Sequence, residues 1–472
     1  MSLDHRAMGL ALACALAGCG RLGFDPTTVA ISDAATSDGA GDAPSTGPTG
    51  PRWLSHIATA GTVLVTGAAG EVVAATAFTG SLAGDGFAVT GMAPFGSVAA
   101  VRYDAQGNVA STAVLDSTSR CDLRGLGIRG NDAIVLGYAQ GGTTTPALGP
   151  CAVASGHQDP VAIGVDRQGN QYLVAHWVAA GANAQAFDVA AFADGTVAIA
   201  GVYSSGLTIG GALPTAGFDP NAYLARTADA AATPSWATAI TAPATLYPGP
   251  LAASGDELCA LGSFSGSATI LGHPLTSLGG IDGWVARIDG TGAARFVRQL
   301  GSTSDDTASG NGGMVADGGG CAAGLTLAAD ATVDGVVLPV SQGPGAVVWF
   351  DATGAATAGI RLPASPLLAS AGGRIYAAMT VTAPLAIGPD VYTPAGSDVI
   401  VVEVDRSGLR RLVGAVTGTG DQVLSTGFPS GFAAIAPDAV AISVRSTGQL
   451  VFGGSTSDSG ATMVDVVVAL GV

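Results

Sequence analysis

The sequence predicts an all-β protein that is built from tandem antiparallel units of short strands. Apolar runs of four to eight residues, such as Val72–Ala75 and Val464–Leu470, are separated by Gly, Asp, Thr and Pro, which is typical of strands joined by turns. The chain of 472 residues contains 72 Gly and 24 Pro, so turn-forming residues are abundant. Related strings recur about every 60 residues, and no amphipathic stretch of helical length lies between them.

Composition excludes several classes of protein. The 18 basic residues are all Arg, they are outnumbered by 35 acids, and the formal net charge is -17. Binding to nucleic acid needs clustered cations, so we expect no nucleic-acid partner. A hydrophobic content of 48% argues against wholesale disorder. Beyond the N-terminus, no apolar run reaches the ~20 residues that a membrane-spanning helix requires.

The N-terminal residues predict export and lipid anchoring. A short segment with Arg6 precedes an apolar region over Ala7–Ala17, as in a secretory signal peptide at residues 1–18. The string Leu16-Ala17-Gly18-Cys19 resembles the bacterial lipobox. That resemblance implies cleavage before Cys19, acylation (palmitate among the chains) of this residue and a lipid anchor in the membrane. Plain secretion is the alternative.

A polar tether is predicted after the anchor. Residues 19–51 are rich in Ser, Thr, Pro, Gly and Asp and offer nothing to bury, so we expect a flexible spacer. The protein is then placed in the cell envelope, with a preference for the outer membrane or cell surface because Gly20, and not Asp, follows Cys19.

The rest of the chain, residues 52–472, divides into seven repeats. The recurring string is a Gly or Asp, an apolar strand and Asp-x-x-Gly, and each repeat offers four strand candidates. The predicted units are 52–107, 108–169, 170–230, 231–292, 293–354, 355–408 and 409–472. Repeated units that cannot bury their own faces stack radially, so we predict a seven-bladed β-propeller of four-stranded antiparallel blades. We expect Val466–Leu470 to share a blade with a strand from the region 53–78, which would close the ring.

The repeat resembles the bacterial seven-bladed β-propeller (SBBP-type) repeat. Its outline is a strand ending in Gly-x-Phe-x-Gly, then Asp-x-aromatic, an apolar strand and Asp-x-x-Gly, and Leu261–Leu300 is the copy most like it. The resemblance implies the propeller architecture and an exported location. Members of that family share no single activity.

Four cysteines remain after Cys14 in the signal peptide and Cys19 at the anchor. An even number in an exported protein suggests disulfides. The sequence favours a bond between Cys121 and Cys151, which fall within one unit. Cys259 and Cys321 fall at the same position of consecutive units, and a disulfide there is left open beside simple packing of two small side chains.

No acidic or histidine motif indicates a cofactor or metal. An Asp recurs at the start of one strand of several repeats, and its spacing is explained by turn capping; the set is Asp159, Asp219, Asp282, Asp398 and Asp465. Asp305-Asp306 is interpreted as a solvated turn. The histidines of the mature chain are scattered without metal-ligand spacing; they are His56, His157, His176 and His273.

Two classes of function compete. The sequence favours a non-enzymatic binding or structural scaffold for protein or polysaccharide partners in the cell envelope, and it predicts no catalytic residues. The alternative is an exported propeller enzyme, a glycan lyase or hydrolase with a site built from loops at the channel mouth. Convergence of several polar groups in one pocket would distinguish the enzyme from the scaffold.

Overall fold

The computed structural model confirms the all-β fold. It describes residues 50–58, 63–68, 70–91, 96–115, 120–140, 157–177, 183–204, 206–214, 221–228, 231–241, 246–307, 313–371, 373–418, 421–424, 432–436, 439–452, 455–458 and 464–471. Within these residues the chain forms strands β1 to β37 and a single turn of 3-10 helix, η1 (Val340–Gln342). No helix in this part of the chain is long and apolar enough to cross a membrane.

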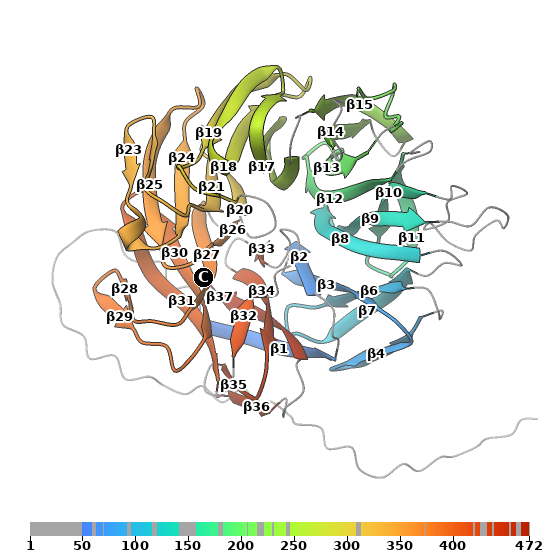
Figure 1. Ribbon diagram of the computed structural model, residues 1–472. Coiled ribbons are helices and arrows are strands. Elements are labelled where there is room, and N and C mark those ends of the chain that lie inside the picture. Colours follow the sequence, from blue (N-terminus) through green and yellow to red (C-terminus); the bar gives the residue numbers. More distant parts are fainter. Residues whose placement is uncertain are drawn as a thin grey trace, which may run out of the picture. The chain divides into compact units, whose positions relative to one another are not determined.

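Six antiparallel sheets, which we call blades 1 to 6, are each formed by four strands from one stretch of chain (Figure 1). Blade 1 contains β2 (Val63–Ala68), β3 (Glu71–Phe78), β6 (Ser97–Tyr103) and β7 (Val109–Leu115). Blade 2 contains β8 (Arg120–Arg129), β9 (Asp132–Gln140), β10 (Gln158–Val165) and β11 (Gln171–His176). Blade 3 contains β12 (Ala184–Ala191), β13 (Val197–Tyr203), β14 (Asn221–Ala228) and β15 (Ala231–Ile240). Blade 4 contains β16 (Leu246–Ser254), β17 (Glu257–Ile270), β18 (His273–Ile288) and β19 (Ala294–Leu300). Blade 5 contains β20 (Gly313–Asp317), β21 (Gly320–Thr326), β24 (Gly345–Phe350) and β25 (Ala356–Leu362). Blade 6 contains β26 (Leu367–Ala371), β27 (Arg374–Val381), β30 (Asp398–Asp405) and β31 (Gly408–Gly418).

A seventh, larger sheet, which we call the closing sheet, joins the two ends of the described chain. Its strands are β32 (Gln422–Leu424), β33 (Phe432–Ala436), β34 (Ala439–Ser446), β37 (Val464–Gly471) and β1 (Gly50–Ala58), and it continues into β4 (Ser81–Gly84) and β5 (Phe87–Thr90). Strand β37 lies between β34 and β1, with His56 opposite Val466 and Leu54 opposite Val468. The expectation that both ends of the chain share one sheet is confirmed.

The prediction of seven tandem blades is corrected. The structure shows six blades that each come from one stretch of chain, and residues 409–472 do not form a seventh of this kind: β31 completes blade 6, and the following strands need β1 from the other end. The predicted units are offset from the blades by one strand, because each begins with the outermost strand of the preceding sheet. Counted with the closing sheet, seven sheets surround the channel.

The Asp-x-x-Gly strings form the turns between the third and fourth strands of the blades. In blade 1 the Asp104 carboxylate accepts hydrogen bonds from the backbone N–H groups of Gln106 and Asn108 at 2.9 and 2.8 Å. Gly107 has a φ of 82°, which an L side chain rarely adopts. This capping holds the pKa of Asp104 below its ordinary value, although its partial burial acts in the opposite direction. The motif is therefore a structural turn.

Hairpins between the second and third strands tie neighbouring sheets together at their outer edges. Strand β4 pairs with β1 of the closing sheet, and β35 (Gln449–Phe452), which pairs with β36 (Ser455–Asp458), pairs with β31 of blade 6. The bridge between Thr241 and Thr269 links blades 3 and 4 in the same way. Two further hairpins are β22 (Ala331–Val333) with β23 (Val336–Leu338), and β28 (Leu385–Ile387) with β29 (Asp390–Tyr392).

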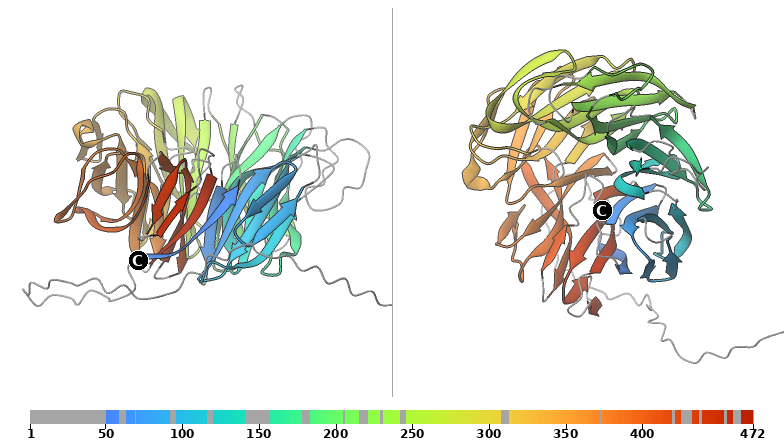
Figure 2. Two further views of the ribbon diagram at one scale, coloured as in Figure 1. Left: turned by 90° about the horizontal axis from the view of Figure 1, so that it is seen from below. Right: turned by 45° about the vertical axis from the view of Figure 1, so that its right-hand side comes forward.

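The hydrophobic core lies between neighbouring sheets. One cluster joins β13 and β14 of blade 3 to β16, β17 and β18 of blade 4, with Trp284 fully buried at its centre. Another joins blade 6 to the closing sheet through Val401 and Val468. The innermost strands β2, β8, β12, β16, β20, β26 and β33 contact one another in that order around the ring, and β33 contacts β2 again. Figure 2 shows the sheets around the ring in two further views. Together they enclose a central channel.

Candidate functional site in the central channel

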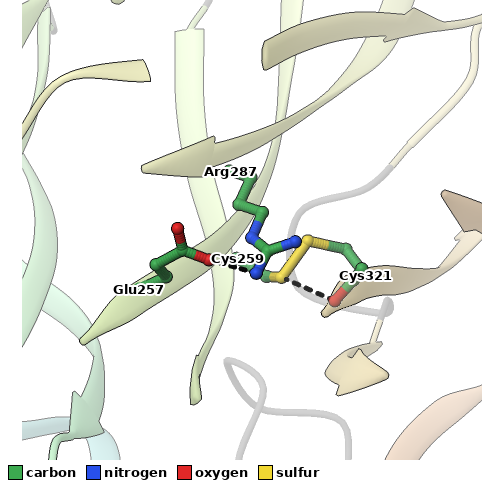
Figure 3. Close-up of a disulfide and its surroundings, with 5 residues drawn as sticks. Glu257, Cys259, Arg287 and Cys321 are labelled. Atoms are coloured by element: carbon green, nitrogen blue, oxygen red, sulfur yellow. Dashed lines mark hydrogen bonds and ion pairs between the residues drawn. A yellow bond between two sulfur atoms is a disulfide. The ribbon is translucent and has the colours of Figure 1, made fainter. Parts of the chain in front are cut away.

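The cysteine predictions have different outcomes. Cys19 and Cys151 lie outside the described residues, and the side chain of Cys121 in β8 is likewise not described, so the lipid anchor and the Cys121–Cys151 bond stay predictions. Cys259 of β17 and Cys321 of β21 form a disulfide between blades 4 and 5, with their Cα atoms 6.0 Å apart (Figure 3). Both residues are buried, at 3% and 0% exposure.

Four of the recurring Asp residues are buried, and two of them bind the loops that precede their strands. Asp282 accepts a hydrogen bond from the Leu278 backbone at 2.7 Å, and Asp398 accepts one from the Ala395 backbone at 3.1 Å. Asp465 pairs with Arg445 at 3.2 Å. Asp219 lies outside the described residues. Within the described ranges, no three acidic, histidine or cysteine side chains are grouped as a metal site would need.

The interpretation of Asp305-Asp306 as a solvated turn is wrong for Asp306. Its side chain is fully buried and accepts hydrogen bonds from the Ser302 backbone at 2.5 Å, from the Ser302 hydroxyl at 3.0 Å and from the Ala328 backbone at 2.7 Å. Burial raises the pKa of Asp306. Asp305 is exposed, as expected.

The histidines are distributed over three sheets. His56 contacts Asp85 at 2.8 Å next to the β4–β5 turn, where it also lowers the pKa of that carboxyl. His176 contacts the buried Asp159 at 3.2 Å in blade 2. His157 also belongs to blade 2, at the start of its third strand, and His273 begins β18 in blade 4. The structure does not gather them around one pocket.

The channel contains a cavity of about 510 Å³, within the range of small-molecule sites. All seven innermost strands line it, mostly with small apolar side chains such as Val65, Ala190 and Ala369. The polar side chains of its wall are Thr66, Ser254, Ser370 and Asp188. Asp188 is the ionisable residue among the described residues that line the cavity.

Asp188 combines burial with contact to the cavity. It lies in the middle of β12 and is 5% exposed. Its Oδ2 accepts a hydrogen bond of 2.6 Å from the Leu251 backbone in blade 4, and the carboxyl also accepts one from the Val189 backbone. Burial outweighs both bonds and raises the pKa of Asp188 to about 7. At neutral pH the group is therefore divided between its protonated and ionised forms.

A β-bulge sets the direction of this side chain. In the β12–β13 ladder Ala186 pairs with Gly201 and Asp188 pairs with Ala200, so Phe187 is an additional residue in β12. A bulge rotates the strand locally and re-aims the next side chain, and such bulges are frequent beside active sites. Here the bulge lies directly before Asp188, which is one of the residues that line the cavity.

The same register position in blades 2 and 5 holds no acid. Asp188 pairs with Ala200, the residue before Gly201. In blade 2 the matching residue is Gly125, which pairs with the residue before Gly137. In blade 5 it is Met314, which pairs with the residue before Gly324. The repeat therefore does not require a carboxyl here. Asp188 is not among the acids that the repeat motifs point to. The signal for it in the sequence is a lone acid inside the otherwise uncharged strand Ala184–Ala191.

No protein-family model and no curated protein matches the sequence. Among solved structures, it is similar to the Pyrococcus horikoshii acylaminoacyl peptidase (9% identity, TM-score 0.37, covering 72% of this chain and 45% of the peptidase). It is also similar to the Trypanosoma rangeli sialidase in complex with the inhibitor DANA, with 8% identity and a TM-score of 0.38, covering 86% of this chain and 54% of the sialidase. A third similar structure is the Fusarium graminearum α-L-arabinofuranosidase in complex with an iminosugar inhibitor, with 10% identity and a TM-score of 0.35, covering 86% of this chain and 92% of that enzyme.

The prediction that the chain is not an enzyme is not kept; the three similar proteins named here are enzymes, and with TM-scores below 0.5 these matches describe those proteins and not the activity of this chain. The chain spans about half the length of the peptidase and of the sialidase. At these identities the likeness is one of fold, and the activity of this chain has to be argued from its own residues.

Proposed function

We propose that this protein is a glycan-cleaving enzyme, a hydrolase or lyase, in which Asp188 donates a proton to the departing glycosidic oxygen. An alkoxide is a poor leaving group, so cleavage of a glycosidic bond depends on a proton donor held at the bond. The observation that carries the proposal is a single buried carboxyl at the wall of a ligand-sized channel cavity, with its pKa raised to about 7. A carboxyl of this kind still carries its proton where an exposed Asp has lost it.

The structural role of Asp188 has to be separated from this chemical one. Its bond to the Leu251 backbone ties blade 3 to blade 4 and needs only an acceptor oxygen. Asn keeps such an oxygen but cannot release a proton, whereas Glu keeps the acid and moves it by one methylene. Substitution to Asn therefore tests proton donation without removing the contact between the blades.

The described cavity lining contains one carboxyl and not a pair. A two-carboxylate glycosidase uses two acids that flank the bond. Among the described residues that line the cavity, Asp188 is the carboxyl. We therefore assign only the proton donor, and we assign no base or nucleophile.

The experiment is a screen of the purified full-length protein against envelope and plant polysaccharides, read as release of reducing ends or of unsaturated products. The wild-type protein should cleave at least one glycan, and Asp188→Asn should lower that rate by about 10²–10⁴-fold. The matched control is Asp390→Asn, the same substitution at an exposed position of β29, which should leave the rate unchanged. Full activity of the Asp188→Asn protein would refute the assignment.

We propose further that the enzyme is exported and anchored in the cell envelope through Cys19, with outer membrane or surface placement. The support is the lipobox-like string Leu16-Ala17-Gly18-Cys19 and the polar stretch that follows it. The lipid anchor and a polysaccharide ligand are then its partners. Intact-mass analysis should find a chain that begins at acylated Cys19, and Cys19→Ala should move the protein from the membrane to the soluble fraction. A mature chain with unmodified Cys19 would contradict this.

A further inference from the structure

We infer that the channel takes the end of a neutral glycan, built of uncharged sugar units, in preference to one that carries uronic or sialic acids. This inference rests on the proposed glycan-cleaving function and names its substrate class. It comes from the chemistry of the channel wall, which combines backbone groups, hydroxyls and one carboxyl.

The first part of the wall is backbone. Each of the seven innermost strands pairs with one neighbour in its sheet, so its second edge borders the channel. The side chains there are small, with Ala190, Ala252, Ala316 and Ala369 in the lining, and they leave the backbone within reach of a ligand. A strand edge presents N–H donors and C=O acceptors in alternation. A sugar hydroxyl, which both donates and accepts, matches such an edge.

The second part is a set of hydroxyl groups on three sheets. Thr66 comes from β2 of blade 1, Ser254 from the end of β16 in blade 4, and Ser370 from β26 in blade 6. Ser254 and Ser370 are exposed, so their hydroxyls are accessible from the solvent side. Hydroxyls spread around a ring can hydrogen-bond a ligand that carries hydroxyls in several directions, as a hexose does.

The third part is the charge. Asp188 is the acidic residue among the described residues of the cavity wall, and once ionised it repels a ligand carboxylate nearby. Recognition of a carboxylate is strongest with a bidentate guanidinium. The buried Arg226 of the same blade is engaged elsewhere, because it pairs with Asp194 at 2.8 Å and with Asp256 at 2.5 Å and its guanidinium lies 3.8 Å from the ring centre of Phe192. The formal net charge of -17 acts in the same direction on an anionic polymer.

The inference also separates the two proposed reactions. A lyase that eliminates across a uronic acid needs the uronate carboxylate to be neutralised as its neighbouring proton leaves. A neutral sugar offers no such acidified proton, so its glycosidic bond is cleaved by hydrolysis with water as the second substrate. A neutral substrate therefore implies that the enzyme is a hydrolase.

The test is equilibrium binding by isothermal titration calorimetry with the full-length wild-type protein at pH 8, where the Asp188 carboxyl is ionised, and with thio-linked tetramers, which resist cleavage. The probes are tetramers of glucose, galactose, mannose and xylose, together with tetramers of glucuronic and galacturonic acid. At least one neutral tetramer should bind about ten-fold more tightly than either acidic one. Ser370→Arg, which places a guanidinium at an exposed position of the wall, should weaken binding of that neutral tetramer and strengthen binding of the acidic ones.

Failure of this inference differs from failure of the proposed function. Acidic tetramers that bind as tightly as neutral ones, or cleavage confined to acidic glycans in the activity screen, would overturn the neutral substrate class and leave Asp188 as proton donor. Binding of no tetramer, with cleavage of an acidic glycan by the wild-type protein, would also overturn the substrate class alone. Cleavage of no glycan, neutral or acidic, would overturn the proposed function itself.

Discussion

Removal of the disulfide between Cys259 and Cys321 should lower the free energy of unfolding by about 4 kcal/mol. The bond closes a loop of 62 residues that contains the rest of blade 4 and the start of blade 5. In the chain-entropy relation, a loop of that length costs the unfolded chain about 14 cal/mol/K, which is about 4 kcal/mol at 25 °C. The estimate concerns the unfolded state, so it needs no change in native packing.

Three variants test this value: Cys259→Ala, Cys321→Ala and the double substitution. Each one breaks the same link, so each should lose about the same free energy, and the double variant should lose no more than about 1 kcal/mol beyond either single one. The assay is urea unfolding, followed by the fluorescence of Trp284 in blade 4 and Trp349 in blade 5, which are both buried.

The reasoning would be refuted in either of two ways. A loss below about 1 kcal/mol would show that the link does not restrain the unfolded chain. Losses that simply add in the double variant would show that packing of the two side chains, and not their bond, provides the stability.

Three further predictions follow from the fold and the site. Deletion of residues 465–472 removes most of β37, which lies between β34 and β1, so it should abolish cooperative unfolding of the whole ring. A melting temperature within about 2 °C of wild type would contradict this. Burial raises the pKa of Asp188 from an ordinary 3.8 to about 7. The folded state therefore binds more protons than the unfolded state between these pH values, and stability falls as the pH rises through them. Asp188→Asn should melt at a higher temperature than wild type at pH 8 and lose this advantage near pH 4. The Arg361 guanidinium donates hydrogen bonds to the backbone carbonyls of Leu327, Leu338 and Gly343. Arg361→Lys should therefore lower the free energy of unfolding in urea by about 2–3 kcal/mol. A loss below about 0.5 kcal/mol, the size of a surface change, would refute this role.

Local patterns made the strands, the turns and the closing contact predictable. The string from Asp104 to Gly107 fixes a turn because the carboxylate caps it and the glycine has a positive φ, both of which depend on residues next to one another. The pairing of β37 with β1 was predictable because the repeats begin one strand out of phase with the blades. The number of four-stranded blades was not predictable, because the closing sheet also takes up the β4–β5 hairpin and has seven strands, which no local pattern indicates.

The candidate site depends on contacts between distant residues, and for that reason the sequence did not reveal it. Asp188 follows a bulge at Phe187, burial raises its pKa, and its carboxyl bonds to Leu251 of blade 4, which begins more than 50 residues later. Burial of Asp306 is likewise set by the Ala328 backbone of the next blade. The Cys259–Cys321 bond could be considered from spacing alone, but the 6.0 Å between its Cα atoms is a property of how two blades pack.

The central claim is that Asp188 acts as a proton donor in the channel, and a pH–rate profile tests it most directly. On a glycan that the protein cleaves, kcat/KM of the wild-type enzyme should fall above a pKa of about 7, as the buried carboxyl loses its proton. Asp188→Glu should keep a descending limb at a shifted pH, and Asp188→Asn should lose the limb together with most of the rate. An Asp188→Asn enzyme that retains the wild-type rate and the same descending limb would contradict the account.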